Sequence, residues 1–104
     1  MFKPAKQTCS DMSTLWQFAT ELKDIFDNVT PKFVHSKYEI ELKYQIRTKR
    51  IIVFVKIFRK ESTMHSVLKT GMPVYTLNDV HFVKQYLSGL IKTFVEDSYN
   101  GTSD

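Results

Sequence analysis

Residues 37–47 read Lys-Tyr-Glu-Ile-Glu-Leu-Lys-Tyr-Gln-Ile-Arg, and this alternation of polar and apolar side chains decides the fold. The apolar members are Tyr38, Ile40, Leu42, Tyr44 and Ile46. Successive side chains of a strand point to opposite faces, so a period of two predicts a strand with one dry face and one wet face.

Two further strands are predicted after this one. Residues 51–58 (IIVFVKIF) are largely apolar at both parities, which is typical of a central strand that is covered on much of its second face. Thr48-Lys49 separates the two runs and predicts an antiparallel hairpin. Its loop should be longer than two residues, because the Asn-Gly or Asp-Gly pair is missing. A weaker third strand is expected over residues 64–70, broken by Gly71-Met72-Pro73.

Amphipathic helices flank the strands. The first is predicted to start at Ser13 or Thr14 and to end before Pro31. Its apolar residues recur at helical spacing: Leu15, Phe18, Ala19, Leu22, Ile25 and Phe26. The second is predicted over residues 77–95; Thr76 with Asp79 resembles a capping box, and Asn78 is the alternative cap. Its apolar stripe consists of Val80, Val83, Leu87, Leu90, Ile91 and Phe94, and Gly89 suggests a close approach to the sheet.

The resulting fold class is α+β, with the order α-β-β-β-α in two layers. Each helix has a single apolar stripe, so both helices are expected on one face of an antiparallel three-stranded sheet. We expect one domain over residues 13–97, a mobile N-terminal tail over 1–12 and a frayed C-terminal tail over 98–104.

Composition narrows the functional classes. The 104 residues are 42% hydrophobic and 25% charged, as in ordinary globular domains. The single cysteine, Cys9, excludes an intrachain disulfide and favours a reducing compartment. No apolar run reaches the roughly 18 residues of a membrane span, and the start lacks the apolar centre of a secretory signal, so a cytosolic or nuclear location is expected.

No enzyme site is indicated. His35, His65 and His81 match no metal-binding spacing, and the three glycines are too few for a phosphate-binding loop. Glu39 and Glu41 share a strand face, where we expect salt bridges to neighbouring lysines. The chain is therefore expected to be non-enzymatic and to need no cofactor, metal or small-molecule substrate.

The charge is segregated along the chain. The net charge is +4, but residues 32–69 hold ten basic and three acidic residues, so this segment alone carries +7. Such asymmetry favours a basic surface that binds a polyanion, and the alternative is a solubilising charged face. The strand pattern places these basic residues on the open sheet face: Lys37, Lys43, Arg47, Lys56 and Lys69. Phe54 and Phe58 share that face and suit either a partner interface or stacking against bases.

Short motifs along residues 14–95 resemble the family of the 9 kDa subunit of the signal recognition particle. The first helix of that family is built around a Trp-x-x-Phe pattern, and Leu15-Trp16-Gln17-Phe18 resembles a shorter form of it. The strand motifs correspond to Leu42-Lys43-Tyr44, Val55-Lys56-Ile57 and Lys69-Thr70, and the start of the last helix to Asp79-Val80. The chain departs from the family at Glu39 and Gln45, where the family has arginines, and Arg47 is placed to compensate for the second.

This resemblance implies an RNA-binding subunit of the Alu domain of the particle, in the cytoplasm. It implies a heterodimer with the 14 kDa subunit, whose sheet continues that of the 9 kDa subunit, and a part in retarding translation elongation, with the ribosome as an indirect partner. It also implies RNA contacts by Lys37, Lys43, Lys56 and Lys69.

Two other functions fit the same residues. One is a module similar to the kinase-associated C-terminal domain, which would use the same lysines on anionic phospholipid headgroups. The other is a protein–protein adaptor on which the basic face is incidental.

Overall fold

The computed structural model describes residues 12–96, so the tails predicted over 1–12 and 98–104 lie outside the described residues, except for Met12. The order is α1 (Met12–Val29), a 3₁₀ helix (Thr30–Phe33), β1 (Tyr38–Ile46), β2 (Ile51–Arg59), β3 (Ser62–Val74), α2 (Leu77–Ile91) and a π-helical turn (Lys92–Glu96). Within residues 12–96, no helix combines the length and the apolar character needed to cross a membrane.

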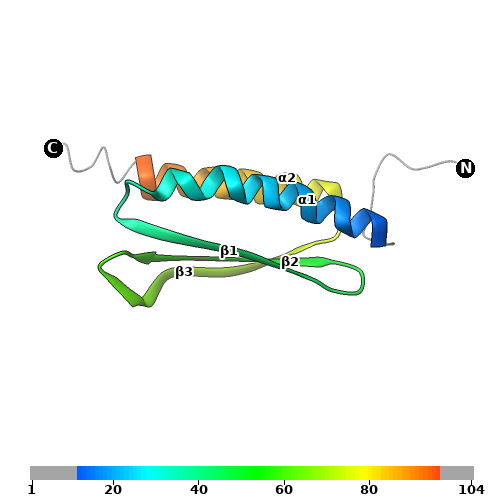
Figure 1. The fold of residues 1–104 in the computed structure, drawn as a ribbon, viewed down its shortest axis with the longest axis horizontal. Helices are drawn as coiled ribbons and strands as arrows, with labels where there is room; N and C mark the ends of the chain where they lie inside the picture. The colour runs from blue at the N-terminus through cyan, green and yellow to red at the C-terminus, as the bar shows by residue number, and fades with distance from the viewer. Residues whose placement is uncertain (1–11, 97–104) are drawn as a thin grey trace, which may run out of the picture.

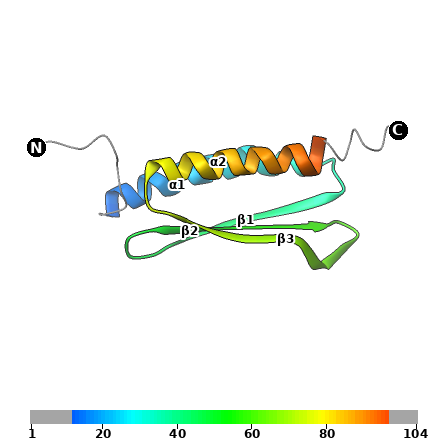
Figure 2. The same cartoon turned by 180° about the vertical axis from the view of Figure 1, so that it is seen from behind.

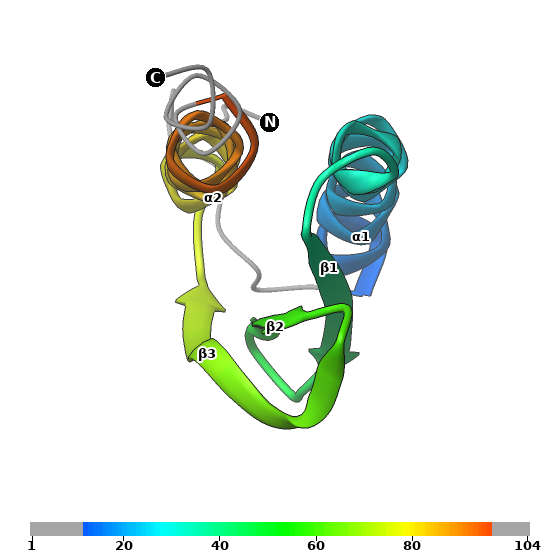
Figure 3. The ribbon, with the colours of Figure 1, turned by 90° about the vertical axis from the view of Figure 1, so that its left-hand side faces the viewer.

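The three strands form one antiparallel sheet in the order β1-β2-β3, with β2 in the centre. Both helices lie on the same side of this sheet, α1 over β1 and α2 over β3 (Figures 1, 2 and 3). The predicted α+β architecture of two layers is therefore confirmed.

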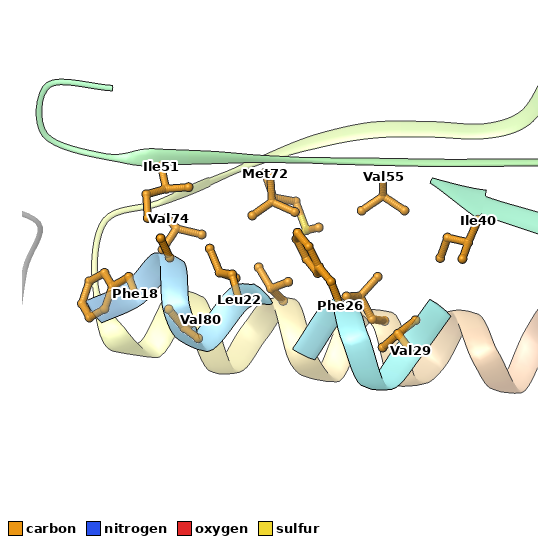
Figure 4. Packing of buried hydrophobic residues seen from close by; sticks show 14 of the residues in the cluster. Phe18, Leu22, Phe26, Val29, Ile40, Ile51, Val55, Met72, Val74 and Val80 are labelled. Atoms are coloured by element: carbon orange, nitrogen blue, oxygen red, sulfur yellow. The ribbon is translucent and has the colours of Figure 1, made fainter. Parts of the chain in front are cut away.

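The core lies between the helices and one face of the sheet (Figure 4). Alternate residues of β2 form the sheet side of the core, and they are fully buried: Ile51, Val53, Val55 and Ile57. The helical side includes Phe18 and Leu22 of α1 and Val80 and Leu87 of α2. Every buried residue of the described core is apolar, so packing holds the two layers together.

The β1–β2 loop covers residues 47–50, between the paired residues Ile46 and Ile51. The Arg47 N–H donates to the Arg50 carbonyl at 2.8 Å and closes this loop. The expectation of a loop longer than two residues is confirmed.

The third strand is longer than predicted. The expected break at Gly71-Met72-Pro73 is wrong, because β3 pairs with β2 without interruption from Leu68 to Val74. A proline is tolerated in β3 because this is an edge strand, where a missing N–H need not interrupt a ladder. Gly71 adopts no positive φ, so it continues the strand instead of turning it.

A β-bulge lies near the other end of β3. The register shifts between Ile57 and Phe58 and again between Phe58 and Arg59. Bulges bend a strand, and in Figures 1 and 2 the tip of the β2–β3 hairpin turns away from the helices. The bent tip of the β2–β3 hairpin therefore borders the open face of the sheet at that end.

The predicted capping box of α2 is confirmed. The Thr76 hydroxyl accepts from the Asp79 N–H, and the Asp79 carboxylate accepts from the Thr76 N–H at 3.0 Å.

Lys60 has a structural role that the sequence did not indicate. Its Nζ donates to the carbonyls of Phe33 (3.0 Å) and Val34 (2.6 Å) at the end of the 3₁₀ helix. Lys60 thereby ties the β2–β3 turn to the helical layer.

Gly89 does not bring α2 close to the sheet. It is exposed, and a Cβ added there would meet no atom within 4 Å. The close approach suggested by the sequence is wrong.

Candidate nucleic-acid interface

The sheet face opposite the helices is built in rows that run across the three strands. One row is Lys43, Phe54 and Gly71, and the next is Glu41, Lys56 and Lys69. Each row takes one residue from β1, one from β2 and one from β3. The register of the sheet thus gathers three lysines that lie far apart in the sequence.

A hollow of about 550 Å³ opens over these two rows. Among the described residues, its lining includes Lys43, Lys56 and Lys69, and Glu41 is the one carboxylate. Three positive charges against one negative charge make the hollow electropositive. Clefts lined by one sign of charge concentrate ligands of the opposite sign, so this hollow favours an anion.

Glu41 lies between two of the lysines. Its Oε2 is 3.3 Å from the Lys43 Nζ, and its Oε1 is 3.8 Å from the Lys56 Nζ. The predicted salt bridging of Glu41 is confirmed. The three side chains are 67% (Lys43), 39% (Lys56) and 39% (Glu41) exposed, so both ion pairs are weak and an incoming anion can replace them.

Lys69 faces Lys56 directly across β2 and β3. Like charges at opposed positions destabilise a sheet. This arrangement adds nothing to folding, and an anion bound between the two ammonium groups would offset their repulsion.

Lys37 and Arg47 lie beyond the two ends of β1, roughly 33 Å apart at the rise of an extended strand. The Arg47 Nη2 donates to Gln45 Oε1 at 2.6 Å, which holds the guanidinium beside the rim of the hollow that Gln45 lines. The backbone carbonyl of Lys37 accepts from the Lys60 N–H at 3.0 Å. Of the five predicted basic residues, the structure brings Lys43, Lys56 and Lys69 into one hollow and places the other two toward opposite ends of the face.

Phe54 is the aromatic residue of the hollow. It is 38% exposed and lies between Lys43 and Gly71 in its row. Phe58 is half-buried and lies farther along β2, opposite Glu39 on β1 and Ser66 on β3. The two phenylalanines share the open face as predicted, but only Phe54 lines the hollow.

Sequence reasoning missed the pairing of Lys56 with Lys69 and the place of Gly71 beside Phe54. Both depend on the register between β2 and β3, which the pattern within a strand does not contain. The expected break at Gly71 also removed that residue from the sheet.

Comparisons of this chain with protein-family models, with curated proteins and with solved structures found no match.

Proposed function

We propose that this chain is a non-enzymatic RNA-binding subunit that holds a phosphate backbone on the open face of its sheet. The observation that carries the proposal is the hollow in which Lys43, Lys56 and Lys69 gather from three different strands. Lysine ammonium groups neutralise phosphates and release condensed counterions, which supplies affinity without reading the base sequence.

The position of these lysines favours a folded RNA. Strand residues are held by the sheet ladder, so the spacing of the backbone positions that carry the lysines is fixed before binding. RNA helices are recognised largely by their shape and backbone, which suits a sheet surface that carries charges at set positions. Phosphate contacts position the protein, and the shape of the RNA supplies the selectivity.

Within this proposal, the resemblance to the 9 kDa subunit of the signal recognition particle gives the most specific assignment. The α-β-β-β-α order and the short motifs around Lys43, Lys56 and Lys69 support it. The RNA would then be the Alu domain of the particle, the partner the 14 kDa subunit, and the role a cytoplasmic one in retarding translation elongation. β1 lies at one edge of the sheet, and a sheet edge suits pairing with a strand of such a partner.

The test is the double variant Lys43→Glu/Lys56→Glu, measured for binding to an Alu-type RNA by fluorescence anisotropy over a series of salt concentrations. We expect weaker binding at every concentration. Loss of two phosphate contacts should also reduce the slope of log K against log salt by about 1.4 to 1.8. The melting temperature should stay close to that of the unaltered chain, because both side chains are more than a third exposed.

The matched control is Lys84→Glu/Lys92→Glu, which makes the same change of charge on exposed residues of the helical layer. It should retain RNA binding. If Lys43→Glu/Lys56→Glu binds the RNA as well as this control does, the proposed site is wrong. If the unaltered chain binds phosphatidylserine vesicles and no RNA, the proposed function is wrong and the membrane-binding alternative takes its place.

A further inference from the structure

The residues around Phe54 differ in kind from the rest of the open face. In the row Lys43, Phe54, Gly71, a cation stands on one side of the ring and a residue without a side chain on the other. In the neighbouring row, Lys56 and Lys69 stand opposite each other. The hollow thus combines an aromatic surface with a pair of cations one row away.

Gly71 leaves part of the Phe54 ring uncovered by side chains. A Cβ built at Gly71 would lie 3.7 Å from both Phe54 Cδ1 and Cε1, so the ring lies over Gly71 with no side chain of that residue against it. At the same time, 38% of Phe54 is exposed. A flat group can reach the exposed part of the ring without displacing a side chain at position 71.

The two rows are separated by two residues along each strand, or about 6.6 Å. Neighbouring strands lie about 4.8 Å apart, which sets the spacing of Lys56 and Lys69 at their backbones. A phosphate held between Lys56 and Lys69 would therefore lie one row away from a base stacked on Phe54. The volume of the hollow, about 550 Å³, also lies within the range of small-ligand sites.

We propose that the hollow binds one unpaired nucleotide of the RNA, with its base stacked on Phe54 and its phosphate held between Lys56 and Lys69. The inference rests on the proposed RNA-binding function and names the class of RNA: a helix interrupted by an extruded base. Bases inside a duplex are covered by their neighbours, so only an unpaired base can reach the ring. Phe54 would therefore set specificity, and the lysines would supply affinity.

The experiment compares a blunt RNA duplex with the same duplex carrying one bulged nucleotide. Binding is measured by fluorescence anisotropy for the unaltered chain and for Phe54→Ala, Phe54→Leu and Phe54→Trp. The unaltered chain should prefer the bulged duplex. Phe54→Ala should weaken binding of the bulged duplex by roughly 5- to 150-fold, the range measured for base–aromatic stacking, and leave binding of the blunt duplex unchanged.

Two variants separate stacking from simple apolar contact. Phe54→Leu keeps an aliphatic group over Gly71, so the fold is retained, and it should lose the preference for the bulge as Phe54→Ala does. Phe54→Trp should keep the preference. The matched control is Phe82→Ala on α2, which removes a 57% exposed phenylalanine from the helical layer and should change neither affinity.

The outcomes distinguish the two proposals. If the chain binds both duplexes equally, or if Phe54→Leu keeps the preference for the bulge, the nucleotide site is wrong while RNA binding through the lysines still stands. If neither duplex binds, the proposed function fails as well. If Lys43→Glu/Lys56→Glu binds them normally, the lysine site is wrong, although RNA binding itself still stands.

Discussion

The two faces of β2 carry side chains with opposite effects on the stability of the fold. On the face toward the helices, Val53, Val55 and Ile57 are almost completely buried, and their neighbours are apolar residues of α1 and α2. On the open face, Phe54 and Lys56 belong to rows that contain a glycine and a second lysine. The inner face holds side chains that stabilise the fold, whereas the open face holds several that cost stability. Such costs are expected where a surface serves a ligand.

The largest effect on stability is expected when isoleucine is replaced by alanine on the helix-facing side of β2, and the same replacement on its open face is the comparison. Ile57→Ala leaves a cavity in the core and should lower the free energy of unfolding by about 2–5 kcal/mol. Ile52→Ala, on the open face of the same strand and only half-buried, should cost clearly less. Urea denaturation of both variants measures the difference. Equal losses would mean that the open face is packed in the folded protein and is not free for a ligand.

Gly71→Ala should raise stability by roughly 0.5–1 kcal/mol, because glycine within a strand loses more conformational freedom on folding than alanine does. The new Cβ would lie at ordinary contact distance from Phe54, and Gly71 has no positive φ that would strain an alanine. Thermal denaturation measures the change. A loss of stability would show that the open face is already optimised for folding, against the contrast drawn between the faces.

The sequence predicted the inner face better than the open one, for a physical reason. Burial follows the period within each element, and the alternation over residues 37–47 and the stripe of α1 both contain it. The open face depends on how strands align with one another. Lys56 meets Lys69 because of the register between β2 and β3, which the pattern within either strand does not contain, and Gly71 lies beside Phe54 because β3 continues where local preferences predicted a break.

The electrostatic predictions follow the same division. Ion pairs of Glu41 with lysines could be expected from residues two apart on one strand, as with Lys43, but the second pair crosses from β1 to β2. Lys60 is a basic residue of the positive segment that serves the fold, by binding carbonyls of residues near Phe33. The charge count along the chain therefore predicted that the surface is positively charged. It could not separate lysines that stabilise the fold from lysines that are available to a ligand.

Lys69→Glu tests whether the opposed lysines are kept at the expense of folding. A glutamate at this position would face Lys56 with opposite charge, and we expect the free energy of unfolding to rise by about 0.2–1 kcal/mol. The same change should weaken RNA binding, since it removes a phosphate contact. Urea denaturation and fluorescence anisotropy measure the two effects on one protein. A variant that loses stability, or that gains stability and binds RNA normally, would contradict the assignment of Lys69 to the ligand.

The smallest effect, a change in RNA affinity, is expected from a substitution of Glu41, whose carboxylate pairs with Lys43 and Lys56 in the absence of a ligand. Its carboxylate lies 3.3 Å from the Lys43 Nζ and 3.8 Å from the Lys56 Nζ, so a phosphate must displace both contacts before it binds. Glu41→Gln keeps the size of the side chain and removes the competing charge. Exposed ion pairs contribute about 0.2–1 kcal/mol, so the affinity for RNA should rise by roughly 1.5- to 5-fold, and the stability of the fold should change little.

Salt makes this last test specific. Exposed charges are screened as ionic strength rises, so the gain of Glu41→Gln over the unaltered chain should be largest at low salt and shrink toward 1 M. The control is Glu21→Gln on α1, which removes the same charge from an exposed position in the helical layer and should give a smaller gain at every salt concentration. Equal gains from the two variants would show that the RNA responds only to net charge. A larger gain at Glu41 would place the phosphate beside the lysines that Glu41 contacts, on the face that carries the strand's unfavourable residues.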